Sequence, residues 1–233
     1  MRYNDDWEYI LADESREQDP VSKAQRTVSE LLEWAICFLI AYILYLFINY
    51  FVGTISGVRQ KSMYPTVVQG EEVVIQRPTI FKKDLNYGDI ITFEAPNESL
   101  YTDYDNFEKT SELAIYSEHT GFDWFCYNFM GIGKTNYIKR VIGLPGDHIV
   151  ISDDGYVYRN GQKLEEPYLN DGITNKDENK YVDLIVPEDS VYVLGDNRLE
   201  SKDSRYFGCI PESKITGYVL FRIWPLSRFG GID

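Results

Sequence analysis

The sequence predicts a mainly β fold with one transmembrane helix near the N-terminus. Residues 34–52 form an apolar run of 19 residues in which Asn49 is the one polar position. After residue 53, short runs rich in β-branched and aromatic residues alternate with Gly, Pro, Asn and Asp. The 233 residues are 44% hydrophobic and 15% aromatic, which supports a buried core and excludes extensive disorder.

Residues 1–30 are polar and acidic and predict a flexible tail. The predicted transmembrane helix covers residues 31–52. Its apolar run would measure about 28 Å as a helix, close to the thickness of a bilayer core. A buried core helix would need a polar face, and a cleaved signal peptide would be shorter and end at an Ala-x-Ala site. A retained single span is therefore preferred to both alternatives.

The orientation of the span follows from the cations beside it. Arg16, Lys23 and Arg26 precede the run, whereas Arg59 and Lys61 follow it. Positive charge concentrates on the cytoplasmic side of membrane proteins, so this small excess favours a cytoplasmic N-terminus. Residues 53–233 would then form one extracytoplasmic domain.

Eight runs in residues 53–233 have the length and composition of strands. They are Glu72–Gln76, Asp89–Phe93, Tyr137–Ile142, His148–Ile151, Tyr156–Arg159, Tyr181–Val186, Val191–Leu194 and Ile215–Ile223. No strong helical periodicity occurs outside the membrane run, so the domain is expected to be mainly β.

Residues 95–136 fit no strand pattern and are interpreted as an insertion. The segment is acidic at its start and aromatic towards its end. Its aromatic side chains are expected to pack against the domain, with contact to a partner or a membrane as the alternative. Those side chains are Phe122, Trp124, Phe125, Tyr127 and Phe129.

Composition excludes several classes of function. The net charge of −14 leaves no basic face for nucleic acid. The three cysteines and the two histidines match no metal-ligand spacing, and the cysteines form no disulfide framework. No metal and no cofactor is expected. Because residues 53–233 carry 19 basic and 28 acidic residues, membrane contact by this part must be apolar rather than polybasic.

Ser62 and Lys139 are the candidate chemical groups. A serine hydroxyl is a poor nucleophile until a base removes its proton, and a lysine amine can act as that base when burial keeps it neutral. On an extended segment Lys139 shares a face with Tyr137 and Val141, which could desolvate it. Taken alone, Ser62 is more simply a turn residue and Lys139 a surface lysine.

The remaining candidates lie near position 200. Asp203 and Arg205, taken alone, are most simply a surface ion pair of little energetic value. Read together with Ser62 and Lys139, however, they complete three ordered motifs. These are Ser62–Thr66 (SMYPT), Lys139–Asp147 (KRVIGLPGD) and Gly195–Arg205 (GDNRLESKDSR).

These motifs resemble those of the type I signal peptidases, membrane-bound serine proteases that use a Ser-Lys dyad. They look like the family's S-M-x-P-T, K-R-V-x-G-x-P-G-D and G-D-N-R-x-x-S-x-D-S-R boxes. The element Gly88–Ile90 is similar to a further box, with Tyr87 where arginine is usual. The resemblance extends over residues 31 to about 224 and implies an antiparallel β-sheet catalytic domain.

The resemblance also implies roles for the matching residues. Ser62 would be the nucleophile, Lys139 the general base, and Ser201 the partner that orients the Lys139 amine. The Ser62 backbone N–H would stabilise the oxyanion. Structural support would come from the rest of the motifs: Arg140, Asp203 and Arg205 as an ion-paired scaffold, and Gly195.

Gln60 and Lys61 depart from the family pattern, which usually has small residues before the nucleophile. The Gln60 amide is a further candidate oxyanion donor, or that donor is missing. Lys61 would either lower the pKa of Lys139 or point into solvent, and solvent is the preferred interpretation.

The predicted activity is endoproteolytic removal of N-terminal signal peptides. The expected partners are exported preproteins with Ala-x-Ala-like cleavage sites and a lipid bilayer, and no nucleic acid. The alternative is a catalytically silent or substrate-specialised relative that serves as an assembly or binding module for surface proteins. A soluble self-cleaving Ser-Lys repressor is disfavoured by the span and by the lack of a basic helix for reading DNA.

Overall fold

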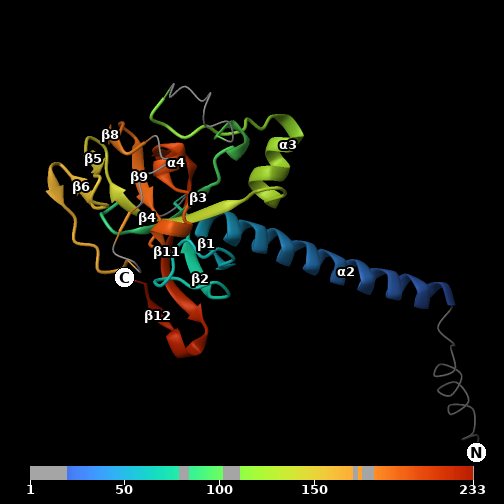
Figure 1. Cartoon of the computed structure of the whole chain (residues 1–233). Coiled ribbons are helices and arrows are strands. Elements are labelled where there is room, and N and C mark those ends of the chain that lie inside the picture. Colours follow the sequence, from blue (N-terminus) through green and yellow to red (C-terminus); the bar gives the residue numbers. More distant parts are fainter. Residues whose placement is uncertain (1–19, 79–83, 102–110, 170–172, 175–180, 233) are drawn as a thin grey trace, which may run out of the picture. The chain divides into compact units, whose positions relative to one another are not determined.

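The computed structural model describes residues 20–78, 84–101, 111–169, 173–174 and 181–232 (Figure 1). The chain divides into two compact units, Met1–Phe47 and Ile48–Asp233. We treat each unit by itself.

The first unit contains helix α2, Pro20–Phe47. Within the described residues it is the one helix that is long and apolar enough to cross a membrane, and its apolar part is Gln25–Phe47. The helix begins at Pro20, inside the predicted tail of residues 1–30, and ends at Phe47, whereas the span was predicted to extend to residue 52. Proline suits the first helical turn, and residues 21–30 contain no glycine or second proline to break the helix. The rest of that tail, residues 1–19, lies outside the described residues.

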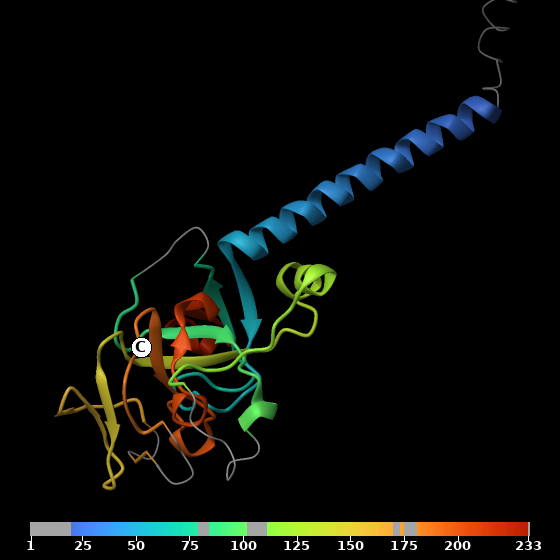
Figure 2. The same cartoon turned by 90° about the horizontal axis from the view of Figure 1, so that it is seen from above.

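The second unit starts with a turn of π-helix, η1 (Ile48–Val52), and is built from two antiparallel sheets. Figures 1 and 2 show the sheets from two directions. The larger sheet has the order β1-β2-β11-β3-β4-β9-β10, with β12 paired to β11. Its strands are β1 (Gly53–Gly57), β2 (Glu72–Gln76), β3 (Ile90–Glu94), β4 (Asn136–Gly143), β9 (Ser190–Leu194), β10 (Ile210–Pro211), β11 (Ile215–Trp224) and β12 (Gly230–Gly231).

The smaller sheet has the order β7-β6-β5-β8. Its strands are β5 (His148–Ile151), β6 (Val157–Arg159), β7 (Gln162–Lys163) and β8 (Asp183–Ile185). Short helices connect the strands: η2 (Glu98–Tyr101), α3 (Gly121–Phe125), η3 (Cys126–Met130), η4 (Arg198–Glu200), α4 (Ser204–Phe207), η5 (Glu212–Lys214) and η6 (Leu226–Arg228). The predicted mainly β, antiparallel fold is thereby confirmed.

All eight predicted strands are present, with ends that differ from the prediction by at most two residues. Four further strands were not predicted. Three of them, β7, β10 and β12, are two residues long and leave no periodic pattern. The fourth, β1, reads GTISG and has few β-branched residues, yet it pairs along its whole length with β2.

Three buried clusters form the core of the second unit. The largest lies between β3, β4, β9 and β11 and includes Phe93, Val141 and Val193, all 0% exposed. A second cluster lines the smaller sheet. The third surrounds Met63 and Val67 and lies beneath the loop between β1 and β2. That loop carries Ser62.

The insertion differs in part from its prediction. Tyr101 and Ala114 pack into the large cluster, as expected of an insertion packed on the domain. In α3, by contrast, Phe122, Trp124 and Phe125 are 79%, 46% and 44% exposed. The expectation that these aromatic rings are covered by the domain is therefore wrong for α3, whereas Tyr127 is half-buried and the side chain of Phe129 lies outside the described part of the chain.

Candidate active site

The loop between β1 and β2 holds Ser62 in a fixed position. Its base is closed by a hydrogen bond from the Val58 amide to the Glu71 carbonyl, at 2.8 Å. Met63, directly after Ser62, and Val67 are both 0% exposed and serve as apolar anchors. The hydroxyl of Ser62 is thus attached to a loop that cannot shift without opening the core.

Lys139 reaches Ser62 from strand β4. Its side chain is 1% exposed, and its Nζ lies 2.7 Å from Ser62 Oγ. The same Nζ donates to the Ile138 carbonyl at 3.0 Å and lies 5.3 Å from the ring centre of Tyr137. Two residues that are far apart in the sequence therefore form one buried hydrogen-bonded pair.

The environment of Lys139 favours the neutral amine. Burial lowers its pKa to about 8, although the negative charges of Asp203 and Asp196 act in the opposite direction and Arg205 adds to the lowering. A neutral amine has a lone pair with which to accept a proton. A neutral amine at this distance from Ser62 Oγ is chemically able to accept the hydroxyl proton near physiological pH.

The rate of peptide cleavage should depend on this pKa. Because the protonated amine is inactive as a base, kcat/KM should rise about tenfold per pH unit below a midpoint near 8. Above the midpoint the rate should level off. The measurement is the pH profile of kcat/KM for a short peptide substrate without ionisable side chains. A flat profile between about pH 6 and 9 would contradict the assignment.

Arg140, the neighbour of Lys139, connects three segments. Its guanidinium forms two hydrogen bonds to Asp196, at 2.9 and 2.8 Å, and stacks on the ring of Tyr168. Asp196 also accepts a hydrogen bond from the Thr66 hydroxyl. The predicted scaffold grouped Arg140 with Asp203, whereas the structure pairs Arg140 with Asp196. This link joins β4 to the loop that carries Ser62.

Asp203 and Arg205 form a second buried pair. Arg205 Nε lies 2.8 Å from the carboxylate, and the two side chains are 3% and 0% exposed. Burial raises the pKa of Asp203, but Arg205 and the Gly195 amide outweigh it and hold the pKa below its ordinary value. Arg205 also donates to the carbonyl of Arg198 at 2.8 Å. The pair is hydrogen-bonded to the loop that begins at Gly195, and its supporting role in the site stays a prediction.

Gly195 is packed too closely for any side chain. A Cβ added at this position would lie 2.5 Å from the Ser62 carbonyl oxygen and 2.6 Å from Ser201 Cβ. The Gly195 amide and carbonyl are held by Asp203 and Arg198. An alanine here would therefore push the loop away from Ser62.

We predict that Gly195→Ala lowers kcat by about 100-fold, because a shift of about 1 Å in a reacting group has that effect. Gly57→Ala is the matched control, since nothing lies within 4 Å of a Cβ at Gly57. Both variants are compared by steady-state peptide cleavage, and thermal unfolding confirms that each is folded. Equal activity of the two variants would exclude the tight contact as a determinant of the site.

Ser201 lies beside this contact. Its Oγ is buried and meets the distance and angle of a hydrogen bond with no described residue, although it lies near enough to the Asp203 carboxylate to help lower the pKa of that group. The predicted bond between Ser201 and the Lys139 amine is thus not formed in this state, and the role of Ser201 stays a prediction. A buried hydroxyl next to the Ser62 loop keeps its capacity to bind another group.

The residues before Ser62 face outward. Gln60 and Lys61 are both exposed. The exposure of Lys61 agrees with the interpretation that its side chain points into solvent. The Ser62 amide donates no hydrogen bond to any described residue, so it is available to an oxyanion. Whether the Gln60 amide joins it stays a prediction.

Two supporting groups were not singled out from the sequence. Asn197 binds the loop that carries Ser62, because its backbone amide donates to the Ser62 carbonyl at 3.0 Å and its side chain donates to the Lys61 carbonyl. Asn197 stands in the same motif as Gly195, which could have indicated it. Glu71 accepts from Arg222 and pairs with Arg228, and no local pattern predicts these contacts.

The histidines lie away from this site, in surface pairs: His119 with Asp123 and His148 with Asp183. Within the described ranges no three His, Cys, Asp or Glu side chains come together as metal ligands.

Comparison with known proteins gives consistent matches. The family described as signal peptidase, peptidase S26, matches residues 31–224. Signal peptidase IB of Staphylococcus aureus is 32% identical over 215 residues, covering 86% of this chain and 93% of that protein. The probable signal peptidase I-1 of Synechocystis sp. is 32% identical over 192 residues, covering 82% of both chains.

A crystal structure of a signal peptidase I from Enterococcus faecalis V583 is 28% identical, with a TM-score of 0.36, and covers 58% of this chain and 97% of that chain. The matched family region contains Ser62, Lys139 and the supporting loop from Gly195 to Arg205. The chain belongs to the signal peptidase family, peptidase S26, and is a serine peptidase of the signal peptidase I type.

Proposed function

We propose that the chain removes signal peptides with Ser62 as nucleophile and Lys139 as general base. One observation carries this assignment: Lys139 Nζ lies 2.7 Å from Ser62 Oγ, with both residues buried. That distance is within hydrogen-bond reach, as proton transfer requires. The lowered pKa of Lys139 supplies the neutral amine.

The reaction would proceed in two steps. Lys139 accepts the proton of Ser62 while Oγ attacks the scissile carbonyl, and the resulting ammonium protonates the leaving amine. The acyl ester on Ser62 is then hydrolysed by a water molecule whose proton passes to Lys139, and the Lys139 ammonium returns this proton to Ser62 Oγ as the ester bond breaks. In both steps the Ser62 amide stabilises the oxyanion. The Ser201 hydroxyl, which lies beside Asp203, would accept a hydrogen bond from the Lys139 amine and orient it.

The supporting groups would hold this geometry rather than take part in the chemistry. Arg140 and Asp196 join β4 to the Ser62 loop, and Asp203 with Arg205 fixes the loop that follows β9. Buried ion pairs of this kind are of uncertain net value for stability, but losing one partner is costly. We therefore assign these two ion pairs the role of holding Ser62 in position relative to Lys139.

The substrates would be exported preproteins cut after Ala-x-Ala-like sites. The family supplies the substrate class. The small-residue preference and the membrane placement are further parts of the proposal. We infer that α2 spans the membrane once, with the N-terminus cytoplasmic and residues 53–233 extracytoplasmic. Ser62 comes only a short stretch of sequence after this span.

The test is cleavage of a purified preprotein by the full-length protein in detergent, with the new N-terminus of the product sequenced. A single cut after an Ala-x-Ala-like site supports the proposal. Absence of cleavage of several different preproteins, by protein shown to be folded, would contradict it and favour a silent assembly module. A silent module would have no need of the buried Ser62–Lys139 pair.

A further inference from the structure

The carboxylate that pairs with Arg198 lies outside the three sequence motifs. The Arg198 guanidinium donates to both carboxylate oxygens of Glu166, and the two side chains are 2% and 6% exposed. Glu166 stands in the connection between β7 and β8 of the smaller sheet, and Thr174 of the same connection also accepts from Arg198. The other two motif arginines pair with Asp196 and Asp203, inside the motifs. The smaller sheet thus supplies one member of the buried charge network.

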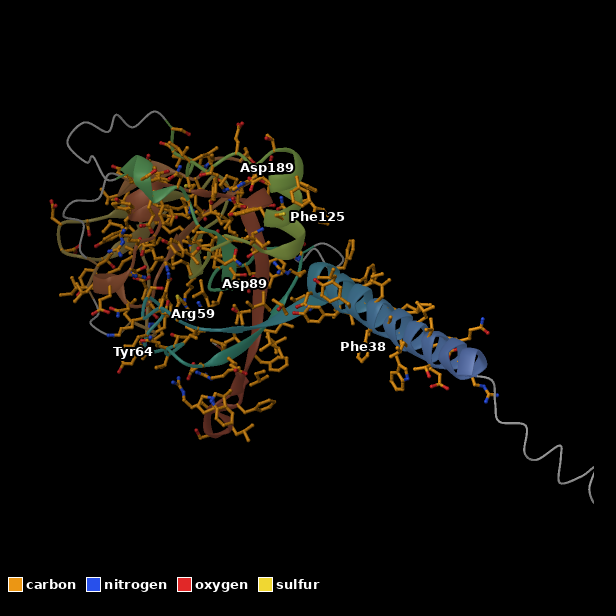
Figure 3. The ribbon with its side chains drawn as sticks, turned by 90° about the vertical axis from the view of Figure 1, so that its right-hand side faces the viewer. Phe38, Arg59, Tyr64, Asp89, Phe125 and Asp189 are labelled. Carbon is orange, nitrogen blue, oxygen red and sulfur yellow. The ribbon has the colours of Figure 1, made fainter. Side chains whose placement is uncertain are left out.

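Arg198 connects this carboxylate to the loop that carries Ser62. Its Nε donates to the Gly195 carbonyl at 3.0 Å, and Gly195 is the residue packed most tightly against the Ser62 carbonyl. Two positions further on, the backbone amide of Asn197 donates to that same carbonyl. Figure 3 labels Tyr64, which marks the loop that receives these contacts. A shift of Arg198 would therefore move the surface against which Ser62 is held.

Tyr168 connects Glu166 to the strand that carries Lys139. Its hydroxyl donates to the Glu166 carboxylate at 2.9 Å, and its ring centre lies 4.1 Å from Cζ of Arg140, the neighbour of Lys139 on β4. A guanidinium stacked on a half-buried ring is a favourable contact. Burial and the charge of Glu166 raise the pKa of Tyr168, so its hydroxyl keeps the proton that it donates. Glu166 is therefore linked to both sides of the site.

We propose that Glu166 is a positioning residue for the peptidase reaction. Through Arg198 and Tyr168 it joins the loop that follows β9 to strand β4. It thereby fixes Ser62 relative to Lys139. This inference rests on the proposed function of that pair. Because Glu166 acts through other residues, it needs no contact with the substrate or with the reacting atoms.

The negative charge of Glu166 is the property that this position requires. Arg198 keeps its positive charge in a protein, so removal of the carboxylate leaves a buried guanidinium uncompensated. The guanidinium would then turn towards water or another acceptor and release the Gly195 carbonyl. Glutamine has the same size and can still accept from Tyr168, but it is neutral. Glu166→Gln therefore separates the effect of the charge from the effect of the shape.

The experiment compares full-length wild type in detergent with Glu166→Gln, Arg198→Met and the double variant. Glu165→Gln is the matched control, because Glu165 is the exposed neighbour in the same connection. Steady-state cleavage of a short peptide gives kcat and KM, at a temperature below the Tm of every variant. Hydrogen–deuterium exchange followed by mass spectrometry reports on the loop Gly195–Arg205, independently of any cleavage.

Glu166→Gln should lower kcat about tenfold with KM unchanged, because a small displacement of the reacting groups has an effect of that order. Exchange in the loop Gly195–Arg205 should become about tenfold faster, because local opening is easier. Glu165→Gln should match wild type in both measurements. In the Arg198→Met background, adding Glu166→Gln should lower kcat by less than about twofold, because the residue through which Glu166 acts is already gone.

Unchanged loop exchange in Glu166→Gln overturns the inference, and so does faster exchange with the kcat of wild type. A further tenfold loss when Glu166→Gln is added to Arg198→Met would show that Glu166 acts by another route. The double variant leaves neither charge unpaired and is expected to fold even if Glu166→Gln does not, so wild-type kcat and exchange in it also contradict the inference. Absence of cleavage by wild type refutes the proposed function instead, and the exchange data then decide whether Glu166 holds the loop.

Discussion

Ser62→Ala is expected to abolish cleavage, with kcat/KM lowered by about a million-fold, as when the nucleophile of other serine proteases is removed. The reason is that in the proposed mechanism the acyl ester forms on Ser62 Oγ, whereas Lys139, with its amine 2.7 Å from that oxygen, acts only as the base. The fold should survive, because the change removes one oxygen from a loop anchored by Met63 and Val67. Steady-state cleavage of a preprotein is the measurement.

Ser213→Ala is the matched control for this variant, because Ser213 is exposed and lies in η5. The control should retain full activity. A second measurement, acid quenching of the wild-type reaction followed by mass spectrometry, should find the acyl group on the peptide that contains Ser62. Cleavage by Ser62→Ala at an appreciable fraction of the wild-type rate would show that another residue is the nucleophile.

The strands could be predicted because their signal is local. Runs such as Ile149–Ile151 and Val191–Leu194 are rich in β-branched residues and end at turn residues, and the structure has strands there. The start of α2 was misplaced because residues 20–30 have good helix-forming propensity but no apolar run to reveal it. The exposure of Phe122 could not be foreseen, because composition does not show which aromatic rings a domain covers.

The candidate site divides in the same way. Ser62 and Lys139 stand in separate motifs whose meeting needs the pairing of β2 with β11, of β11 with β3 and of β3 with β4, and the motifs indicated the residues but not the distance. Arg140 on β4 pairs with Asp196 rather than with Asp203, and this choice depends on the directions of the three side chains, which the sequence does not show. The contact of Glu71 with Arg222 joins residues 151 positions apart and leaves no trace in the sequence.

Lys139→Met is the second large expected effect. Methionine has a similar length and is apolar, so it fills the buried site while removing the amine. We expect kcat to fall by about a thousandfold or more, which is typical of a lost general base. Thermal stability should not fall, because the amine is 1% exposed and its burial disfavours the charged form. Cleavage rate and Tm are measured on the same preparation.

Lys61→Met is the control for a lysine near Ser62, since Lys61 is exposed, and it should keep wild-type activity and its pH profile. In Lys139→Met, the residual rate should lose the inflection near pH 8 that wild type shows, because the group responsible is gone. A variant that kept the inflection would assign that titration to another residue. A variant that kept the rate would remove Lys139 as the base and leave its contact with Ser62 as a structural hydrogen bond.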